Sequence, residues 1–404
     1  MSISPLPSLL KTLPPAQRLL GNIIRIKEGA GGLSHTKFVQ DTTIAWMPKM
    51  LVSRSKAESS EISLLEFVES ALIYYAIPLV GGKFFLPLFK KLSAKPIKSE
   101  YLLKPLSEIP KAAQKSVLPV KAAIIFSSIA ATAIGGEYVL NFAKNLMTAK
   151  VYKKSRFSDV VNLSAALPNP NNPALDQNNP VITKSKRRIK QALGVAAAFI
   201  VGSALLARFG GGSNITKVLE PFVKKFDFAF SSAKNGKKTL GLGRNQMLTY
   251  MAIGYASYID AARDKLERVE VASRVGFILG YLAFGQELID KAVGKIFGKA
   301  KPLAQIAAET AGNPAAFRKA LVSKSAVTFI PLLFGMLVAG LGVGLLSRLW
   351  TAQRFKQAQP QSQSPSIAGT QNLALFVKRV SARASGRNPF APQKTGLSST
   401  FVLN

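Results

Sequence analysis

The chain has 404 residues, of which 48% are hydrophobic and 18% are charged, and 54 lysines and arginines against 20 aspartates and glutamates give a net charge of +34. It has no cysteine and a single histidine, His35. This composition excludes disulfides, thiolate metal centres, cysteine nucleophiles and any site that needs two histidines. The long apolar stretches described below favour a membrane protein.

The first part of the chain is predicted to hold a flexible, basic N-terminal segment, residues 1–40, and then a helical membrane unit, residues 41–156. The segment lacks the G-x-x-x-x-G-K-[ST] spacing of a phosphate-binding loop. The membrane unit contains two apolar stretches, residues 70–89 and 122–136. Each has the length of a helix that crosses most or all of the hydrocarbon core of a bilayer, which is about 30 Å thick.

A basic linker rich in proline and asparagine is predicted over residues 157–189, because those residue types break helices. A central apolar helix, residues 191–207, follows within a connecting region, residues 190–245. The basic cluster before this helix is expected to lie on the cytoplasmic side and to attract anionic lipid headgroups by about 1 kcal/mol per charge. Its members are Lys184, Lys186, Arg187, Arg188 and Lys190.

A second helical membrane unit is predicted over residues 246–356, and a disordered basic tail over residues 357–404. Residues 325–347 are uncharged and long enough to span a membrane, and residues 275–286 form a shorter apolar stretch. Small residues spaced by about one helical turn predict close helix packing in the central helix and in this unit. They are Gly194, Ala198 and Gly202, then Gly276 and Gly280, and finally Gly340 and Gly344.

The two membrane units share a pattern that predicts an internal duplication. Residues 41–76 align with residues 250–285, and both contain the string R-x-K-x-E-x-x-E, at 54–61 and at 263–270. Residues 112–153 align with residues 315–356. Repeats of this kind are a feature of several classes of membrane transporter. If the central helix crosses the membrane once, the second copy could be inverted relative to the first.

The acidic residues have two interpretations that the sequence leaves open. Arg54 with Glu58, and Arg263 with Glu267, are spaced for salt bridges within one helix. Alternatively, carboxylates inside a membrane are costly and usually functional, so some of them could form an ion path. The candidates are Glu58, Glu61, Glu66, Glu69, Glu137, Asp264, Glu267, Glu270 and Glu287.

These observations predict an all-α, polytopic membrane protein with four to five transmembrane helices and a duplicated helical-hairpin unit. We expect a non-enzymatic membrane scaffold without cofactor or metal, in a bacterial inner or organellar inner membrane, that contacts anionic headgroups and is compatible with a homo-oligomer. The first alternative is a small secondary transporter or channel, which is favoured if the acidic residues face an internal cavity. The second is a basic nucleic-acid-associated protein, which is disfavoured because the basic residues are spread between apolar stretches rather than gathered in one patch.

Overall fold

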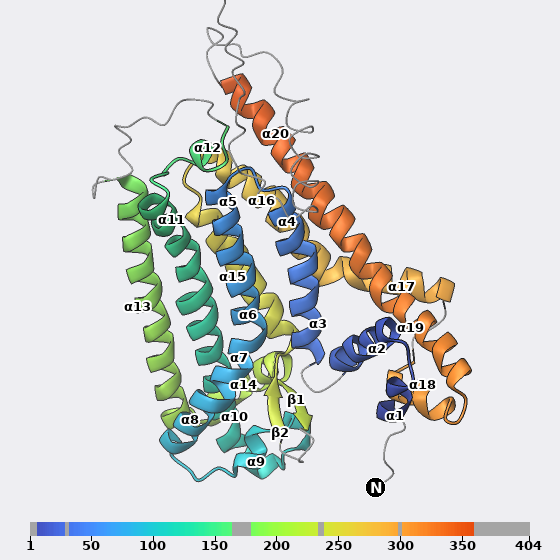
Figure 1. The fold of residues 1–404 in the computed structure, drawn as a ribbon. Helices are drawn as coiled ribbons and strands as arrows, with labels where there is room; N and C mark the ends of the chain where they lie inside the picture. The colour runs from blue at the N-terminus through green and yellow to red at the C-terminus, as the bar shows by residue number, and fades with distance from the viewer. Residues whose placement is uncertain (1–5, 29–31, 164–178, 233–237, 298–300, 359–404) are drawn as a thin grey trace, which may run out of the picture.

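The computed structural model describes residues 6–28, 32–163, 179–232, 238–297 and 301–358. Apart from one antiparallel hairpin of two strands, their regular structure is helical (Figure 1), and the predicted all-α class is confirmed. Much of the predicted linker, residues 164–178, and nearly all of the predicted tail, residues 359–404, lie outside the described residues.

Four helices are long and apolar enough to cross a membrane: Lys56–Leu92, Lys111–Val151, Pro180–Phe209 and Pro314–Gln357. Each contains one of the predicted apolar stretches, whereas residues 275–286 belong to a helix outside this set. Helices suit this role because they satisfy their own backbone groups in lipid. Their segments are α5 (Lys56–Ile62), η2 (Ser63–Val68), α6 (Glu69–Ala71), η3 (Leu72–Ala76), α7 (Ile77–Val80), η4 (Gly81–Phe85) and α8 (Leu86–Leu92); α10 (Lys111–Ile129), η6 (Ala130–Tyr138) and α11 (Val139–Val151); α13 (Pro180–Phe209); and α19 (Pro314–Phe334), η9 (Gly335–Gly342) and α20 (Val343–Ala358).

Some π-helical segments have a local cause in the sequence. Pro48, Pro78 and Pro87 each stand at the second position of the α-helical segment that follows a π-helical one. A proline removes a backbone hydrogen bond, and its ring clashes with the carbonyl group four residues earlier. That carbonyl falls in the wider π-helical turn, so the helix continues through the proline instead of ending there.

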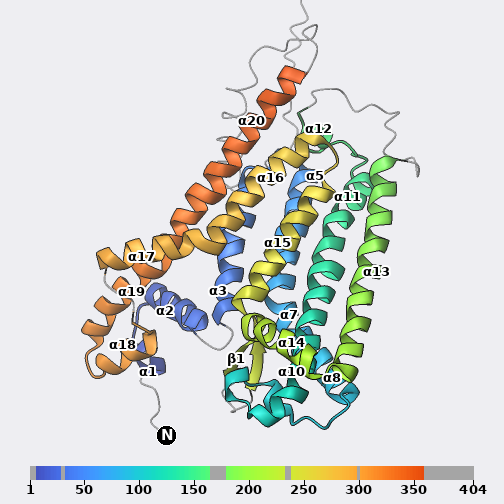
Figure 2. The same cartoon turned by 180° about the vertical axis from the view of Figure 1, so that it is seen from behind.

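Further helices complete the bundle between α13, which lies at one edge beside α10 and α11, and α19–α20, which lie at the other (Figures 1 and 2). The helices that begin with α5 and α16 start at one end of the bundle, where α11 and α20 finish. This end is the upper one in Figure 1. The additional bundle segments are α3 (Gly32–Asp41), η1 (Thr42–Trp46), α4 (Met47–Leu51), α15 (Arg244–Ala261), α16 (Lys265–Gly280), η8 (Tyr281–Gly285) and α17 (Gln286–Phe297).

Short elements connect and cover the long helices. In the hairpin, Ala229 pairs with Gly241 and Ser232 pairs with Lys238, and it lies with α8, α9 and α14 at the lower end of the bundle (Figure 1). The N-terminal α1 and α2 lie beside α18 and α19. The bounds are α1 (Leu6–Lys11), α2 (Pro15–Glu28), α9 (Ser99–Leu102), the 3₁₀ helix η5 (Leu106–Glu108), α12 (Phe157–Val160), α14 (Ser213–Phe226), β1 (Ala229–Ser232), β2 (Lys238–Gly241) and α18 (Leu303–Glu309).

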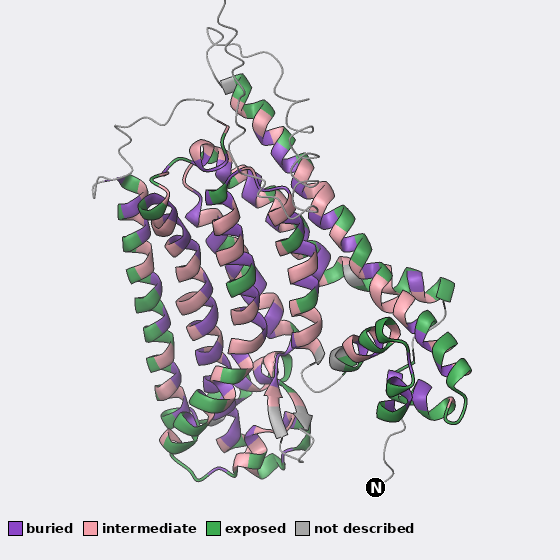
Figure 3. Cartoon of the chain, in the orientation of Figure 1, coloured by how far each residue is buried: buried purple, intermediate pink, exposed green. Residues whose placement is uncertain are grey.

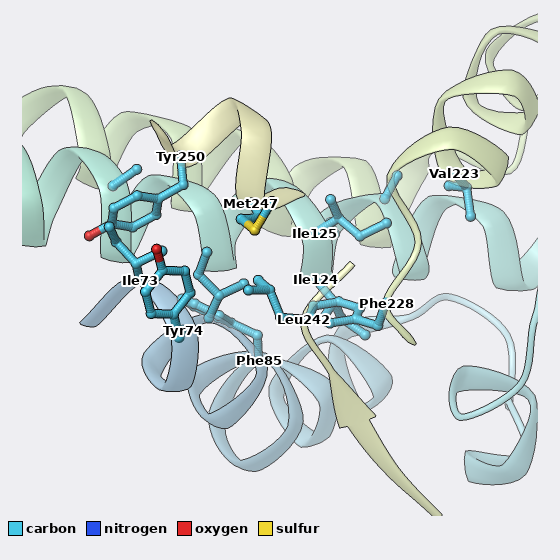
Figure 4. Close-up of a cluster of buried hydrophobic side chains, with 14 of the residues drawn as sticks. Ile73, Tyr74, Phe85, Ile124, Ile125, Val223, Phe228, Leu242, Met247 and Tyr250 are labelled. Carbon is cyan, nitrogen blue, oxygen red and sulfur yellow. The ribbon is translucent and has the colours of Figure 1, made fainter. Parts of the chain in front are cut away.

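The largest buried hydrophobic cluster joins the first two long helices to α15 and the hairpin region. Tyr74, Phe85 and Tyr250 are among its largest fully buried side chains, and Met247 and Ile125 extend the cluster from these rings toward Val223 (Figure 4). Residues from both predicted membrane units therefore share one core. The two predicted units are packed against each other and do not have separate hydrophobic cores.

Helix α13 presents a different face to the bundle than the glycine spacing suggested. Its buried side chains include Ala192 and Ala196, whereas an ideal Cβ on Gly194 or Gly202 would meet no atom within 4 Å. The outward face carries exposed large side chains such as Phe199 (Figure 3), as expected for a helix that faces lipid. The four helices that are long and apolar enough to cross a membrane are compatible with an integral membrane protein.

The other predicted packing glycines divide by environment. A Cβ on Gly340 would overlap the Ile44 carbonyl group, so this glycine permits a close approach of η9 to η1. Gly276 lies against the Tyr255 ring, Gly344 lies at the edge of contact with Val52, and Gly280 faces open space.

Candidate functional site

The two R-x-K-x-E-x-x-E strings form the beginnings of α5 and α16. Ser55 caps α5 by accepting a hydrogen bond from the Glu58 backbone N–H (3.0 Å), and Asp264 caps α16 by accepting one from Glu267 (2.8 Å). In both strings the arginine backbone N–H donates to the carboxylate of the glutamate four residues later. Both glutamates are therefore fixed by the same local geometry, which is common at helix N-termini.

The strings also exchange ion pairs with each other. Arg54 pairs with Glu270 of the second string at 3.0 Å, and Arg263 pairs with Glu61 of the first. Each arginine additionally pairs with the glutamate of its own string, Arg54 with Glu58 at 3.1 Å and Arg263 with Glu267 at 3.7 Å. The predicted local pairs are thus present, but they are buried and belong to a larger arrangement.

Side chains from α11 and α20, and one further arginine of α16 itself, complete this ion-pair network. Lys144 of α11 pairs with Glu267 at 3.1 Å, and Arg348 of α20 pairs with Glu58 at 3.0 Å. Thr148 donates to Glu61, and Arg274 pairs with Glu270 at 3.0 Å. The network comprises Arg54, Glu58, Glu61, Lys144, Arg263, Glu267, Glu270, Arg274 and Arg348.

The network keeps the Glu267 carboxylate charged although it is buried. Burial alone would raise the pKa of Glu267, but Arg263 and Lys144 hold that pKa at about 2. Burial likewise works against the charged form of Arg263, and Glu267 and Glu61 nevertheless raise its pKa above the ordinary value. Because every carboxylate of the ion-pair network is matched to a cation, we interpret the network as structural: its ion pairs join the two strings.

A second group of charges surrounds a small internal cavity, which we name the acid cavity. The cavity holds about 20 Å³, enough for roughly one water molecule. Four carboxylic acids and one amine line it, and all five side chains belong to buried residues. They are Asp41, Lys49, Glu66, Glu69 and Glu137.

Three of the four acids have close partners. Lys49 forms an ion pair with Glu66, Ser70 donates to Asp41, and Tyr258 of α15 donates to Glu69. All three contacts link residues that are far apart in the sequence or in different helices. With one amine for four carboxylic acids, however, this cavity lacks the charge balance of the ion-pair network.

Glu137 is the exception within the acid cavity. It is 1% exposed, and among the described residues neither of its carboxyl oxygens has a hydrogen-bond partner. Glu69 and Tyr250 nevertheless lie close enough to interact with this carboxyl group. A Cβ on Gly254 of α15 would overlap the Glu137 carboxyl group. Gly254 therefore makes the room that this carboxyl group occupies.

The remaining candidate residues lie at the surface or near it. Lys184 and Arg188 of the basic cluster pair with Asp260, at 3.8 Å and 3.1 Å, and Asp260 also accepts a hydrogen bond from Tyr138. The other members of the basic cluster, Lys186, Arg187 and Lys190, are exposed. Glu287 is half exposed and pairs with Arg244 at 2.7 Å, so it lies on no internal path in this structure.

Sequence reasoning missed Asp41, Lys49 and Tyr258. A signal for the first two was present, since they are the only charged residues between positions 38 and 53. Tyr258 carries no comparable signal, because its role depends on the approach of α15 to Glu69.

Within the described part of the chain, no group of three histidine, cysteine, aspartate or glutamate residues is arranged to hold a metal ion. No protein-family model matches the chain, and no curated protein and no solved structure shows significant similarity to it.

Proposed function

We propose that the chain consists of two copies of one helical unit, arranged side by side in the same direction. In each copy a helix (residues 32–51 or 244–261) leads to a charged string, a second helix and then a long third helix. The π-helical η3 and η8 occupy aligned positions, and η6 and η9 overlap in the alignment of the third helices. The ion pairs between the strings, and those that the third helices supply, are exchanged reciprocally between the copies.

The parallel arrangement has a simple cause. Helix α13 runs from the upper to the lower end of the bundle, and α15 returns to the upper end (Figures 1 and 2). The second string therefore begins on the same side as the first, although the central helix runs the length of the bundle. If α13 did not run from one end of the bundle to the other, the second copy would begin at the opposite end and the repeat would be inverted.

On this architecture we propose a proton-coupled secondary transporter as the function. The observation that carries this proposal is the acid cavity, with its four carboxylic acids, its one amine and the buried Glu137, which forms no ion pair among the described residues. A buried carboxyl group without a cationic partner is stable only when it is protonated or when it can gain such a partner. A group that changes between these two states releases or binds a proton, which is the step that proton coupling requires.

The location of the acid cavity supports the same function. Tyr258, Val275 and Ile278 of the second copy line it at the positions that align with Lys49, Glu66 and Glu69 of the first. Coupling sites of transporters with repeats lie at such interfaces between the copies. We assign the transferable proton to the carboxyl groups of Glu137 and Glu69, with the Lys49 ammonium group as the fixed counter-charge of Glu66.

A pH jump on reconstituted protein tests this proposal without knowledge of the transported substrate. Proteoliposomes adsorbed on a solid-supported membrane should give a transient current when the external pH changes, because buried carboxyl groups bind or release protons. Glu137→Gln should abolish most of this current, and Glu108→Gln, at an exposed position outside the cavity, should leave it intact. A folded Glu137→Gln variant with the full current would contradict the proposal.

A membrane scaffold that contacts anionic headgroups is the second candidate function. It is favoured by the exposed Lys186, Arg187 and Lys190, which precede the lipid-facing part of α13. Changing all three to Gln should reduce co-purified phosphatidylglycerol, measured by native mass spectrometry, relative to the wild type and to Glu137→Gln. Unchanged lipid binding in the triple variant would remove the support for this role.

A further inference from the structure

A second and larger cavity lies apart from the charged layers, where α2, α3 and α19 meet. It holds about 150 Å³, the volume of an engineered protein cavity that binds benzene. A single six-membered ring therefore fits. The lining residues are Ile23, His35, Thr36, Val39, Gln40, Thr328, Phe329 and Leu332.

The wall of this cavity is apolar except for a few polar groups, and one of these is unsatisfied. Gln40 is 5% exposed, and among the described residues its Oε1 atom has no hydrogen-bond partner. A buried acceptor in this state is less stable than a paired one. A molecule in the cavity that donates a hydrogen bond to Gln40 would recover that difference in stability.

His35 can supply the complementary donor. Its Nδ1 atom lies 2.9 Å from the Tyr75 hydroxyl oxygen. When that hydroxyl group donates to Nδ1, the neutral imidazole carries its hydrogen on Nε2. The cavity then offers an acceptor at Gln40 and a donor at His35, surrounded by Val39, Phe329 and Leu332.

We propose that this cavity binds a small neutral phenol, that is, an aromatic ring that bears a hydroxyl group. The ring occupies the apolar part of the cavity. The hydroxyl group donates its hydrogen to Gln40 Oε1 and accepts a hydrogen bond from His35 Nε2. This site involves none of the residues assigned to proton transfer, so a test of phenol binding neither supports nor contradicts the proposed transport function.

The test compares two probes that differ chiefly in the hydroxyl group, 4-fluorophenol and fluorobenzene. Fluorine NMR on the full chain in lipid nanodiscs, with empty nanodiscs subtracted, should show saturable binding of 4-fluorophenol that unlabelled phenol displaces. We expect 4-fluorophenol to bind about tenfold or more tightly than fluorobenzene, since one neutral hydrogen bond to an otherwise unpaired buried group supplies that discrimination.

Two variants and a matched control locate the site. Leu332→Trp fills the cavity and should abolish saturable binding, whereas Leu333→Trp, at a side chain that is 51% exposed, should not. Gln40→Leu should remove the preference for 4-fluorophenol and, because it deletes the unpaired acceptor, should fold at least as well as the wild type. Equal affinity for both probes in the wild type, or unchanged binding in Leu332→Trp, would overturn the proposal.

Discussion

The ion-pair network makes a direct prediction for Arg263, whose side chain is 1% exposed and joins both strings through Glu61 and Glu267. Arg263→Met leaves Glu61 with the Thr148 hydroxyl group and Glu267 with Lys144 as their remaining side-chain partners. Removing one member of a buried ion pair costs about 3–5 kcal/mol, because the other charge stays buried. We expect a loss of this size in the free energy of unfolding.

The assay is equilibrium or thermal unfolding of the detergent-purified protein, followed by circular dichroism. Arg268→Met is the matched control, because it removes an exposed arginine from the first turn of α16, five residues after Arg263, and should change the stability by less than about 0.5 kcal/mol. The double variant Arg263→Met with Glu61→Gln should recover part of the loss, with a coupling energy above about 1 kcal/mol. If Arg263→Met lowers the free energy of unfolding by no more than Arg268→Met does, the ion pairs between the two strings do not stabilise the protein as we propose.

Three further predictions concern single positions. Gly254→Ala should destabilise the protein by about 1–3 kcal/mol in thermal unfolding because the new methyl group displaces the Glu137 carboxyl group, whereas Gly280→Ala, in open space, should be neutral or stabilising by up to about 1 kcal/mol. Because the pKa of Glu267 falls from an ordinary 4.5 to about 2 on folding, the unfolded state binds more protons below pH 4.5, and acid titration should show stability lost progressively between pH 4.5 and 2. Lys49→Met leaves its partner carboxylate buried without a cation and should lower the unfolding free energy by about 3–5 kcal/mol, an effect that neutralising this carboxylate should largely reverse.

The sequence predicts the helical class and the apolar stretches well because those depend on local composition. It also predicts the pairing of Arg54 with Glu58, since residues four apart share one face of a helix. The pairing of Arg54 with Glu270 lies beyond such reasoning, because only the tertiary arrangement brings the strings together. The same limit applies to Gly194, since helical spacing identifies a face of small residues but not the side on which a neighbour lies.

The ion-pair network and the acid cavity differ in how far the two proposed copies contribute equivalent charged residues. In the ion-pair network the two strings carry the same charged residues at aligned positions, so the pair of Arg54 with Glu270 is repeated as the pair of Arg263 with Glu61. In the acid cavity the acids come from the first copy alone, and the aligned positions in the second hold uncharged residues. They are Tyr250 for Asp41, Val275 for Glu66, Ile278 for Glu69 and Gly340 for Glu137.

This asymmetry leaves the first copy with acids that the second copy cannot neutralise, and Tyr258 meets Glu69 with a hydroxyl group rather than a cation. A duplicated scaffold needs only the balanced layer, because ion pairs between the copies already join them. Unbalanced carboxylic acids at the same interface weaken the structure unless protons occupy them. The presence of these acids beside the balanced ion-pair network is therefore better explained by proton transfer than by a contribution to stability. The pH-jump current of Glu137→Gln distinguishes these two explanations.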